Sequence, residues 1–246
     1  NKYNVPRMAY VNKMDIMGAN FYRVVDMMRE RLKANAIPIQ LPIGAEETFR
    51  GIIDLMSMEA DVYYDDLGKD MRVEPIPADM LDKAQEYHDA MVESICETDE
   101  ELFEKYCEGE EISVDELKAA LRAATIANKI VPVVCGTSYR NKGVQKLLDA
   151  VLDYMPSPLD IPAIKGTTLD GEEVERHADD NEPFSALAFK IIADPFVGKM
   201  SFFKVMNGEV KKDMVLRNTT TGANEKLGKI FMMRGKRQID VDAFAC

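Results

Sequence analysis

Two short apolar runs, each leading through a polar loop into a helical pattern, constrain the fold more than any other feature. The run at residues 130–135 is apolar throughout, which is typical of a strand buried on both faces of a parallel sheet. Residues 5–11 are predicted to form a second buried strand, with Pro6 at its start. Strand, loop and helix are the repeating step of an α/β sheet. We therefore predict an α/β fold with a doubly wound, mainly parallel sheet.

Apolar spacing and capping residues predict the helices beside this sheet. One helix begins near Asn20, and another begins near residue 141. Their apolar positions recur every three or four residues: Phe21, Val24, Val25, Met28 and Leu32 in the first, and Val144, Leu147, Leu148, Val151, Leu152 and Met155 in the second. Both patterns are typical of amphipathic helices.

The segment between these helices has a different pattern. Short strands interrupted by turns are predicted from residue 37 to about 64, and the prolines there favour edge strands. Helices are predicted at 79–97 and 101–106, and a Ser113–Glu116 capping box begins a third that extends to residue 128. We expect an α+β insertion at about 37–129.

A proline-rich connector follows, and it predicts a domain boundary near residue 160. Beyond it, β-type runs at 184–193, 200–206, 214–218 and 226–233 alternate with turn signals. We predict an antiparallel β-barrel over 161–246. Since the chain opens on Asn1 inside a domain, and residues 239–245 look like a strand in need of a partner, we expect an internal fragment with a truncated barrel.

The negative charge is concentrated in one block. Residues 54–129 carry 22 acidic and 7 basic residues, a net of -15, and the rest carries 24 basic and 21 acidic, a net of +3. An RNA or DNA backbone would repel this block, so a partner would be a basic protein surface. The alternative is a solvated face without a partner.

Composition excludes several classes of protein. No apolar run is long enough to span a bilayer, and no signal pattern opens the sequence, so we expect a soluble, cytoplasmic protein without a membrane partner. The four cysteines form no C-x-x-C pair, and only two histidines accompany them. This argues against a zinc site and a disulfide framework.

Polar residues follow both apolar runs, at the sheet edge where open α/β sheets bind ligands. They are Asn12-Lys13-Met14-Asp15 and Gly136-Thr137-Ser138. The carboxylate of Asp15 can accept hydrogen bonds from N1–H and the amino group of guanine, whereas adenine has an acceptor at N1 and no amine at C2. Asp15 would thus select guanine.

The other polar side chains can assist this contact. The Lys13 stem can lie across a flat base, and Asn12 can tie the base to neighbouring loops. A backbone N–H of Thr137 or Ser138 can meet the guanine O6. An N-K-x-D motif is weak by itself, because such a turn after a strand is often only the start of a helix.

Three segments together resemble bacterial-type elongation factor G: residues 12–15, residues 39–44 (IQLPIG) and residues 135–145 (CGTSYRNKGVQ). The resemblance extends over the whole chain. It implies that residues 1–160 are the C-terminal part of a P-loop GTPase domain with the acidic insertion inside it, and that residues 161–246 are a translation-factor β-barrel. GTP or GDP is the implied ligand, with Mg²⁺ in the full-length protein. The implied partners are ribosomal RNA and, through the insertion, the ribosomal stalk protein.

The chain departs from this family in two respects. Thr137-Ser138 stands where the family often has Ser-Ala, but a backbone contact should survive that change. The sequence also contains no G-x-x-x-x-G-K-[ST] segment, and no D-x-x-G precedes Asn12. We therefore predict no catalytic residue, no magnesium site and no GTP turnover in this fragment.

Three functions are compatible with these features. The leading one is a fragment of a ribosomal translocation GTPase of the elongation factor G type. The second is a paralogous ribosome-protection or recycling GTPase. The third is a stand-alone module that binds the ribosomal stalk and has no nucleotide chemistry.

Overall fold

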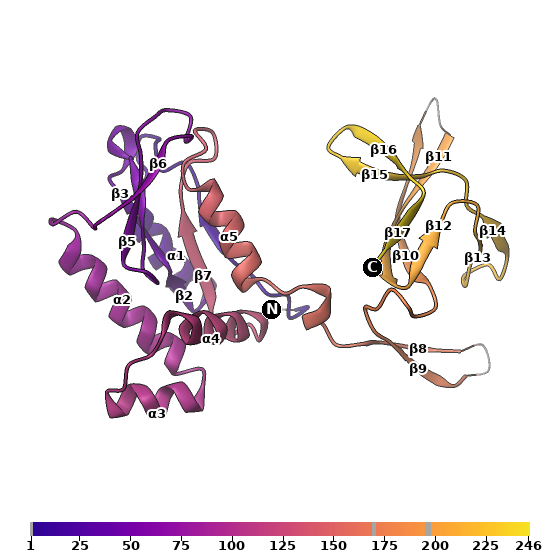
Figure 1. Cartoon of the computed structure of the whole chain (residues 1–246), viewed down its shortest axis with the longest axis horizontal. Coiled ribbons are helices and arrows are strands. Elements are labelled where there is room, and N and C mark those ends of the chain that lie inside the picture. The colour runs from indigo at the N-terminus through magenta and orange to yellow at the C-terminus, as the bar shows by residue number, and fades with distance from the viewer. Residues whose placement is uncertain (1, 169–170, 195–197) are drawn as a thin grey trace. The chain divides into compact units, whose positions relative to one another are not determined.

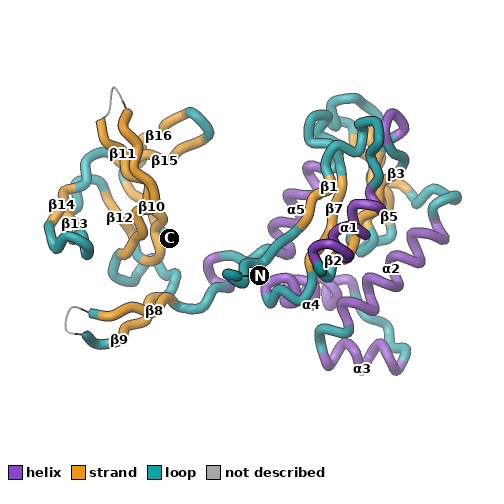
Figure 2. The backbone as a smooth tube through the Cα atoms, turned by 180° about the vertical axis from the view of Figure 1, so that it is seen from behind, coloured by secondary structure: helices purple, strands orange, loops and turns teal. Residues whose placement is uncertain are grey.

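The chain folds into two compact units, Asn1–Pro156 and Ser157–Cys246 (Figure 1). The structure is a computed structural model that describes residues 2–168, 171–194 and 198–246. Helices occur in the first unit, whereas the second is built almost entirely of strands (Figure 2). The predicted class, an α/β part followed by an antiparallel β part, is confirmed.

The first unit contains a three-stranded parallel sheet. β7 (Val131–Cys135) lies in the centre, between β1 (Ala9–Val11) and β2 (Ala36–Pro38). All five residues of β7 are buried, as expected for a strand covered on both faces. The chain passes from β1 to β2 through α1 (Phe21–Leu32), the crossover that parallel strands require.

The first strand is shorter than predicted, because pairing with β7 begins only at Ala9. Asn4 adopts a left-handed conformation with φ of 50°, and the proline at position 6 has no N–H to donate to a neighbour. The Asn4 carbonyl instead accepts a hydrogen bond from Asn128 at 2.9 Å. Val5 is accordingly 59% exposed.

The insertion begins with a four-stranded antiparallel sheet. Its strands follow one another in chain order: β3 (Gln40–Ile43), β4 (Gly51–Asp54), β5 (Glu59–Tyr63) and β6 (Met71–Glu74), with the short helix η1 (Glu46–Thr48) between β3 and β4. Ile39 joins this sheet to the parallel one, since its N–H donates to Val133 and its carbonyl accepts from Leu55. Pro38 and Pro42 lie on edge strands, as predicted.

Three helices complete the insertion, and a side chain caps the second and the third of them. They are α2 (Leu81–Cys96), α3 (Glu100–Glu108) and α4 (Val114–Ile126). Asp99 caps α3 by accepting from the backbone N–H groups of Glu101 and Leu102. The capping box of Ser113 and Glu116 is confirmed at the start of α4, although this helix ends at Ile126 and not at residue 128.

The helices predicted beside the parallel sheet lie where expected, but fewer of their apolar side chains are buried than predicted. Asn20 caps α1 as expected. α5 (Val144–Tyr154) begins three residues later than predicted, after Gly143 with its φ of 84°. In α5 the buried residues are Ala150 and Tyr154. Five predicted apolar positions in the two helices are exposed: Val24, Leu32, Leu148, Val151 and Leu152. The parallel sheet is three short strands wide, which limits the apolar area that it can cover.

One continuous core runs through the whole first unit. Buried side chains of the parallel sheet, such as Val133, pack in the same cluster as Ile53 of the insertion sheet and Leu121 of α4. The next residue of α4, Arg122, donates to the carbonyls of Leu152, Asp153 and Met155 at the C-terminus of α5. The insertion is thus packed into the same body as the sheet that carries it.

The second unit consists of antiparallel strand pairs. After the short helix η2 (Pro158–Asp160), the pairs are β8 (Ile164–Thr167) with β9 (Glu173–Arg176), β10 (Ser185–Asp194) with β11 (Gly198–Asn207), β12 (Glu209–Lys211) with β17 (Ala243–Ala245), β13 (Val215–Arg217) with β14 (Asn224–Lys226), and β15 (Ile230–Arg234) with β16 (Arg237–Val241). Among the described residues, the buried centre is formed by Val205, Val210 and Ile230.

Several strands of this unit differ from the prediction. The predicted strand at 226–233 is divided into β14 and β15, because Gly228 interrupts it. The segment 239–245 is divided between β16 and β17, with Asp242 between them. The patterns also did not indicate β8, β9 or β12, which are short or carry alternating charges. Within the described ranges of the whole chain, no helix has the length and apolar character needed to cross a membrane.

Candidate functional site

The parallel pairing of β1 and β7 brings two polar loops to one edge of the sheet. Residues 12–15 follow β1, and residues 136–138 follow β7, whose last residue Cys135 lies beside Val11. The backbones are joined directly: the N–H of Gly136 donates to Val11 at 3.1 Å, and the N–H of Met14 donates to Gly136 at 3.2 Å. The predicted proximity of the two loops is confirmed.

This close approach requires a glycine at position 136. A Cβ atom there would lie 2.4 Å from the Lys142 carbonyl oxygen and 2.4 Å from the Tyr10 hydroxyl oxygen. Both distances are far below van der Waals contact. The turn after β7 therefore keeps its path only without a side chain.

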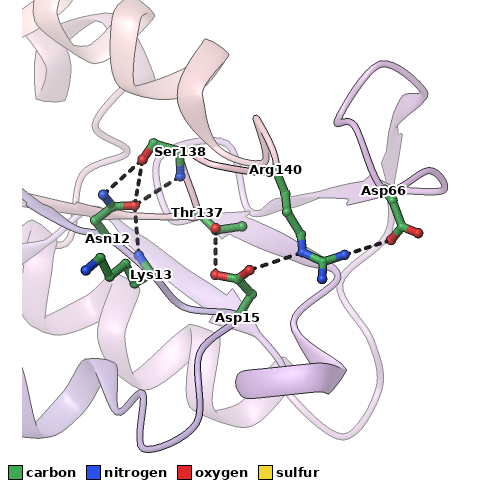
Figure 3. Close-up of polar contacts among 7 residues, drawn as sticks. All are labelled: Asn12, Lys13, Asp15, Asp66, Thr137, Ser138 and Arg140. Carbon is green, nitrogen blue, oxygen red and sulfur yellow. Dashed lines mark hydrogen bonds and ion pairs between the residues drawn. The ribbon is translucent and has the colours of Figure 1, made fainter.

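Asn12 joins the two loops through its side chain (Figure 3). Its Oδ1 accepts from the backbone N–H of Ser138 at 3.0 Å and from that of Lys13 at 2.8 Å. Its Nδ2 lies 3.0 Å from the Ser138 hydroxyl oxygen. The Ser138 N–H, which we expected to face a base oxygen, is thus already bonded to Asn12 in this structure.

Asp15 lies at the centre of the site and is held through both carboxylate oxygens. Oδ1 accepts from the Thr137 hydroxyl at 2.6 Å, and Oδ2 accepts from Nε of Arg140 at 3.1 Å. The hydrogen bond from Thr137 has the largest effect on the pKa of Asp15 and, with the bond and charge of Arg140, lowers it below its ordinary value despite the opposing effect of burial. The side chain is 13% exposed. Asp15 is therefore a carboxylate at neutral pH.

Lys13, like Asn12, is an exposed residue of the first loop. It adopts a left-handed backbone conformation with φ of 62°, which is uncommon for a residue with a side chain. The bond between its N–H and Asn12 holds this conformation. The strained turn presents the lysine at the edge of the site without burying it.

Arg140 also belongs to the site, although no sequence pattern predicted this role. Besides its bond to Asp15, its Nη1 donates to Asp66 Oδ1 at 3.1 Å (Figure 3). Arg140 therefore lies between a carboxylate of the first loop and one from the insertion. No local signal marks this role, because Asp15 is 125 positions away and Asp66 is 74 positions away along the chain.

The insertion also supports the first loop. The backbone N–H of Glu46 donates to the Met14 carbonyl at 2.8 Å, and its carboxylate accepts from the Gly18 N–H at 2.6 Å. Glu46 lies in η1, between two strands of the insertion sheet. Both loops of the site are thus in contact with the insertion.

A cavity of about 350 Å³ lies next to the first loop. Its lining comes from residues 11–20 and from α1, and it includes Lys13, Met17 and Val24. Asp15, Thr137 and Ser138 do not line it. The cavity and the polar cluster therefore meet at Asn12 and Lys13, which line the cavity and also belong to the cluster.

Groups of side chains that could hold a metal ion were sought among the described residues. Within the residues that the structure describes, no group of three or more His, Cys, Asp or Glu side chains is placed to hold one.

Comparison with known proteins identifies the family. Residues 1–157, more than half of the chain, match the family described as elongation factor Tu GTP binding domain. The chain belongs to this family of GTP-binding domains. Residues 183–245 match elongation factor G domain 2. The order of the two matches is the order predicted from the sequence, so the GTP-binding domain of a translation elongation factor is followed by the domain 2 of that class.

A solved structure agrees with this assignment in fold. The crystal structure of a protein from Thermus thermophilus superposes with a TM-score of 0.79 at 26% sequence identity. The match covers 99% of this chain and 33% of that protein. The chain therefore spans about a third of the length of that relative.

Proposed function

We propose that the chain belongs to a ribosomal translocation GTPase of the elongation factor G type, which acts in translation, and that the cluster around Asp15 selects the guanine base of its nucleotide. One observation carries the proposal. The carboxylate of Asp15, ionised at neutral pH, is held between two loops at the edge of the parallel sheet where such sheets bind ligands. The chain that carries it matches a GTP-binding family and elongation factor G domain 2.

The chemistry of Asp15 suits guanine. A carboxylate has about four acceptor positions, of which Thr137 and Arg140 use two. The two that remain match N1–H and the 2-amino group of guanine, and adenine lacks this pair of donors. Lys13 would lie across the base, and the Ser138 N–H would leave Asn12 to donate to the guanine O6. Asn12, Lys13, Asp15, Thr137 and Ser138 would thus form the base site.

The residues of this chain orient the base and do not act on the phosphates. The sequence contains no G-x-x-x-x-G-K-[ST] segment to hold them. GTP or GDP would therefore bind weakly, and no measurable GTP hydrolysis is expected from these 246 residues. A hydrolysis rate above that of buffer, abolished by Asp15→Ala, would contradict this.

Nuclear magnetic resonance of the ¹⁵N-labelled chain tests the base site, since it detects binding in the millimolar range. Titration with GDP should shift the amide signals of residues 12–15 and 137–139, and ADP at the same concentrations should not. Asp15→Asn should lose the response to GDP and gain one to XDP, because xanthine has a carbonyl where guanine has the 2-amino group. Equal responses to GDP and ADP would refute guanine selection.

A matched substitution controls for charge. Asp89→Asn changes charge equally on α2, where Asp89 contacts Gln85. It should leave the GDP response unchanged. A loss of response in both variants would mean that net charge, and not the site, governs binding.

The acidic insertion suits a basic protein partner, which for this family we propose to be the ribosomal stalk protein. Four glutamates of α3, Glu100, Glu101, Glu104 and Glu108, are exposed on one short helix. Opposite charges would attract the partner and fade with salt. Glu101→Lys with Glu104→Lys should weaken binding to purified stalk protein at low salt, whereas Glu172→Lys with Glu173→Lys in the second unit should not. Equal binding by both double variants would refute the proposal.

A further inference from the structure

The loop between β5 and β6 is a compact structure of its own. The carboxylate of Asp65 accepts from three backbone N–H groups within it, those of Leu67 at 3.1 Å, Lys69 at 2.8 Å and Asp70 at 2.9 Å. These bonds lower the pKa of Asp65 below its ordinary value, so the carboxylate that organises the loop is ionised at neutral pH. The loop thus has a defined shape with which to contact a neighbour.

Its neighbour is the segment that follows β7. The Gly68 carbonyl accepts from Nε2 of Gln145 at 2.9 Å, and Asp66 pairs with Arg140 at 3.1 Å. A Cβ atom on Gly68 would lie 2.2 Å from the Asn141 carbonyl oxygen, so the two backbones are in direct contact. The insertion makes a second contact with this segment, because the Tyr63 hydroxyl accepts from the Gly143 N–H at 2.8 Å. The insertion therefore supports the segment that carries Thr137, Ser138 and Arg140.

We propose that Arg140 is a positioning residue of the base site: it holds the Asp15 carboxylate in the orientation that guanine requires, and the β5–β6 loop holds Arg140 in place through Asp66 and Gly68. This inference rests on the proposed function and adds a role for a residue outside the base-contacting set. It also means that the β5–β6 loop of the insertion helps to hold the site in shape.

The geometry of arginine explains why it suits this position. Its guanidinium presents donors in a fixed planar fork, so Nε and Nη1 can bind two different carboxylates at once. Lysine has a single charged centre on a flexible stem and would not hold both with one geometry. Because Thr137 and Arg140 approach different oxygens of Asp15, the carboxylate is fixed against rotation.

The two ion pairs contribute unequally. The Asp15 side chain is 13% exposed, whereas the Asp66 side chain is 84% exposed. A pair with such an exposed partner is weak by itself. The loop must therefore act mainly through the contact at Gly68, and a test of the loop needs a substitution at that residue.

The first test removes the guanidinium. In Arg140→Gln, the affinity for GDP, read from the amide shifts of residues 12–15, should fall about tenfold. This is the loss expected when a hydrogen bond to a charged group is removed. The pKa of Asp15, read from its carboxyl ¹³C signal, should rise, because the bond and the charge of Arg140 both lower it. Arg140→Lys should restore part of both quantities. Arg72→Gln, which removes a guanidinium that pairs with Asp70 and not with Asp15, should change neither.

The second test displaces the loop. Gly68→Ala introduces a clash with Asn141 at a residue whose φ is 63°. It should weaken the Nε–H signal that Arg140 gives when bonded to Asp15, and reduce the GDP response less than Arg140→Gln does. Gly109→Ala has the same left-handed strain with φ of 72° and no atom within 4 Å, so it should have neither effect.

The outcomes separate this inference from the proposed function. If GDP shifts residues 12–15 but Arg140→Gln changes neither the GDP response nor the Asp15 titration, the role of Arg140 is refuted and the base site stands. If Gly68→Ala leaves the Arg140 Nε–H signal intact, the role of the loop is refuted. If GDP shifts nothing in the unsubstituted chain, the proposed function fails, and the Asp15 titration still decides whether Arg140 holds the carboxylate.

Discussion

The two units of this protein differ in how they bury apolar residues. In the first unit, fully buried side chains from both sheets and from the helices form one core, with Leu41, Ile53, Leu121 and Val133 each 0% exposed. In the second unit, Val205, Val210 and Ile230 form the buried centre of the described residues. Alternate residues of β10, Leu187, Phe189 and Ile191, are exposed there.

The difference follows from architecture. Helices packed on sheets enclose side chains from two layers, and each buried large side chain contributes roughly 1.5–3 kcal/mol. Isolated strand pairs enclose little, and a two-stranded hairpin is marginal by itself in water. The stability of the chain should therefore reside in its first unit, and four predictions test or refine that comparison.

The largest expected effect is in hydrogen exchange. Amides of β7 in the first unit should exchange about a thousandfold more slowly than amides of β10 and β11, because opening the first unit breaks a continuous core. The second unit should also unfold at lower denaturant concentration or promote association of the chain. A single cooperative, high-temperature melt of a monomer would contradict the comparison.

Core substitutions should differ almost as much. Ile53→Ala, at a residue with no exposed surface, should lower the free energy of unfolding of the first unit by about 3 kcal/mol. Val215→Ala, at a residue 61% exposed in the second unit, should change stability by no more than about 0.5 kcal/mol. Urea unfolding, followed separately in each unit, measures both. Similar losses would mean that the second unit has a core comparable to the first.

A smaller effect is expected at the turn that shapes the site. Gly136→Ala should cost about 1–3 kcal/mol, because its Cβ would meet the Lys142 carbonyl oxygen at 2.4 Å. Gly166→Ala, in β8 of the second unit, has no atom within 4 Å and should be nearly neutral. The amide shifts of residues 12–15 should move only in the first variant. If Gly136→Ala were neutral, the two loops would be less tightly joined than the distances imply.

The smallest effect concerns the N-terminus of α4. The bonds from Lys105 and Ser113 lower the pKa of Glu116 from its ordinary 4.5 to about 2. Because the pKa is lower in the folded state, this stabilisation is complete above about pH 4.5 and is lost as the pH falls towards 2. Ser113→Ala should cost about 1 kcal/mol near neutral pH and should flatten this pH dependence. A variant with an unchanged acid profile would show that the capping box does not contribute.

Local features of the fold were predictable from the sequence because neighbouring residues determine them. Asn20 and Ser113 cap helices where their spacing indicated, and the apolar run of β7 is buried on both faces. The edge positions of Pro38 and Pro42 follow equally from chemistry, since proline has no N–H for a ladder. The patterns were less reliable for burial, as Leu148 and Leu152 of α5 show, because an apolar stripe does not say how wide the facing sheet is.

The sequence by itself determined the two loops of the site, since each follows a strand and the strands are parallel neighbours. It did not reveal which side chains hold Asp15. Arg140 and Asp66 reach the site across 125 and 74 positions of chain, and the insertion contacts both loops through Glu46 and Gly68. Such contacts depend on how separate elements pack in space, and the spacing of residues along the chain does not predict them. Tertiary structure therefore determined which residues hold Asp15 and the two loops in place, whereas the local sequence determined where along the chain the site lies.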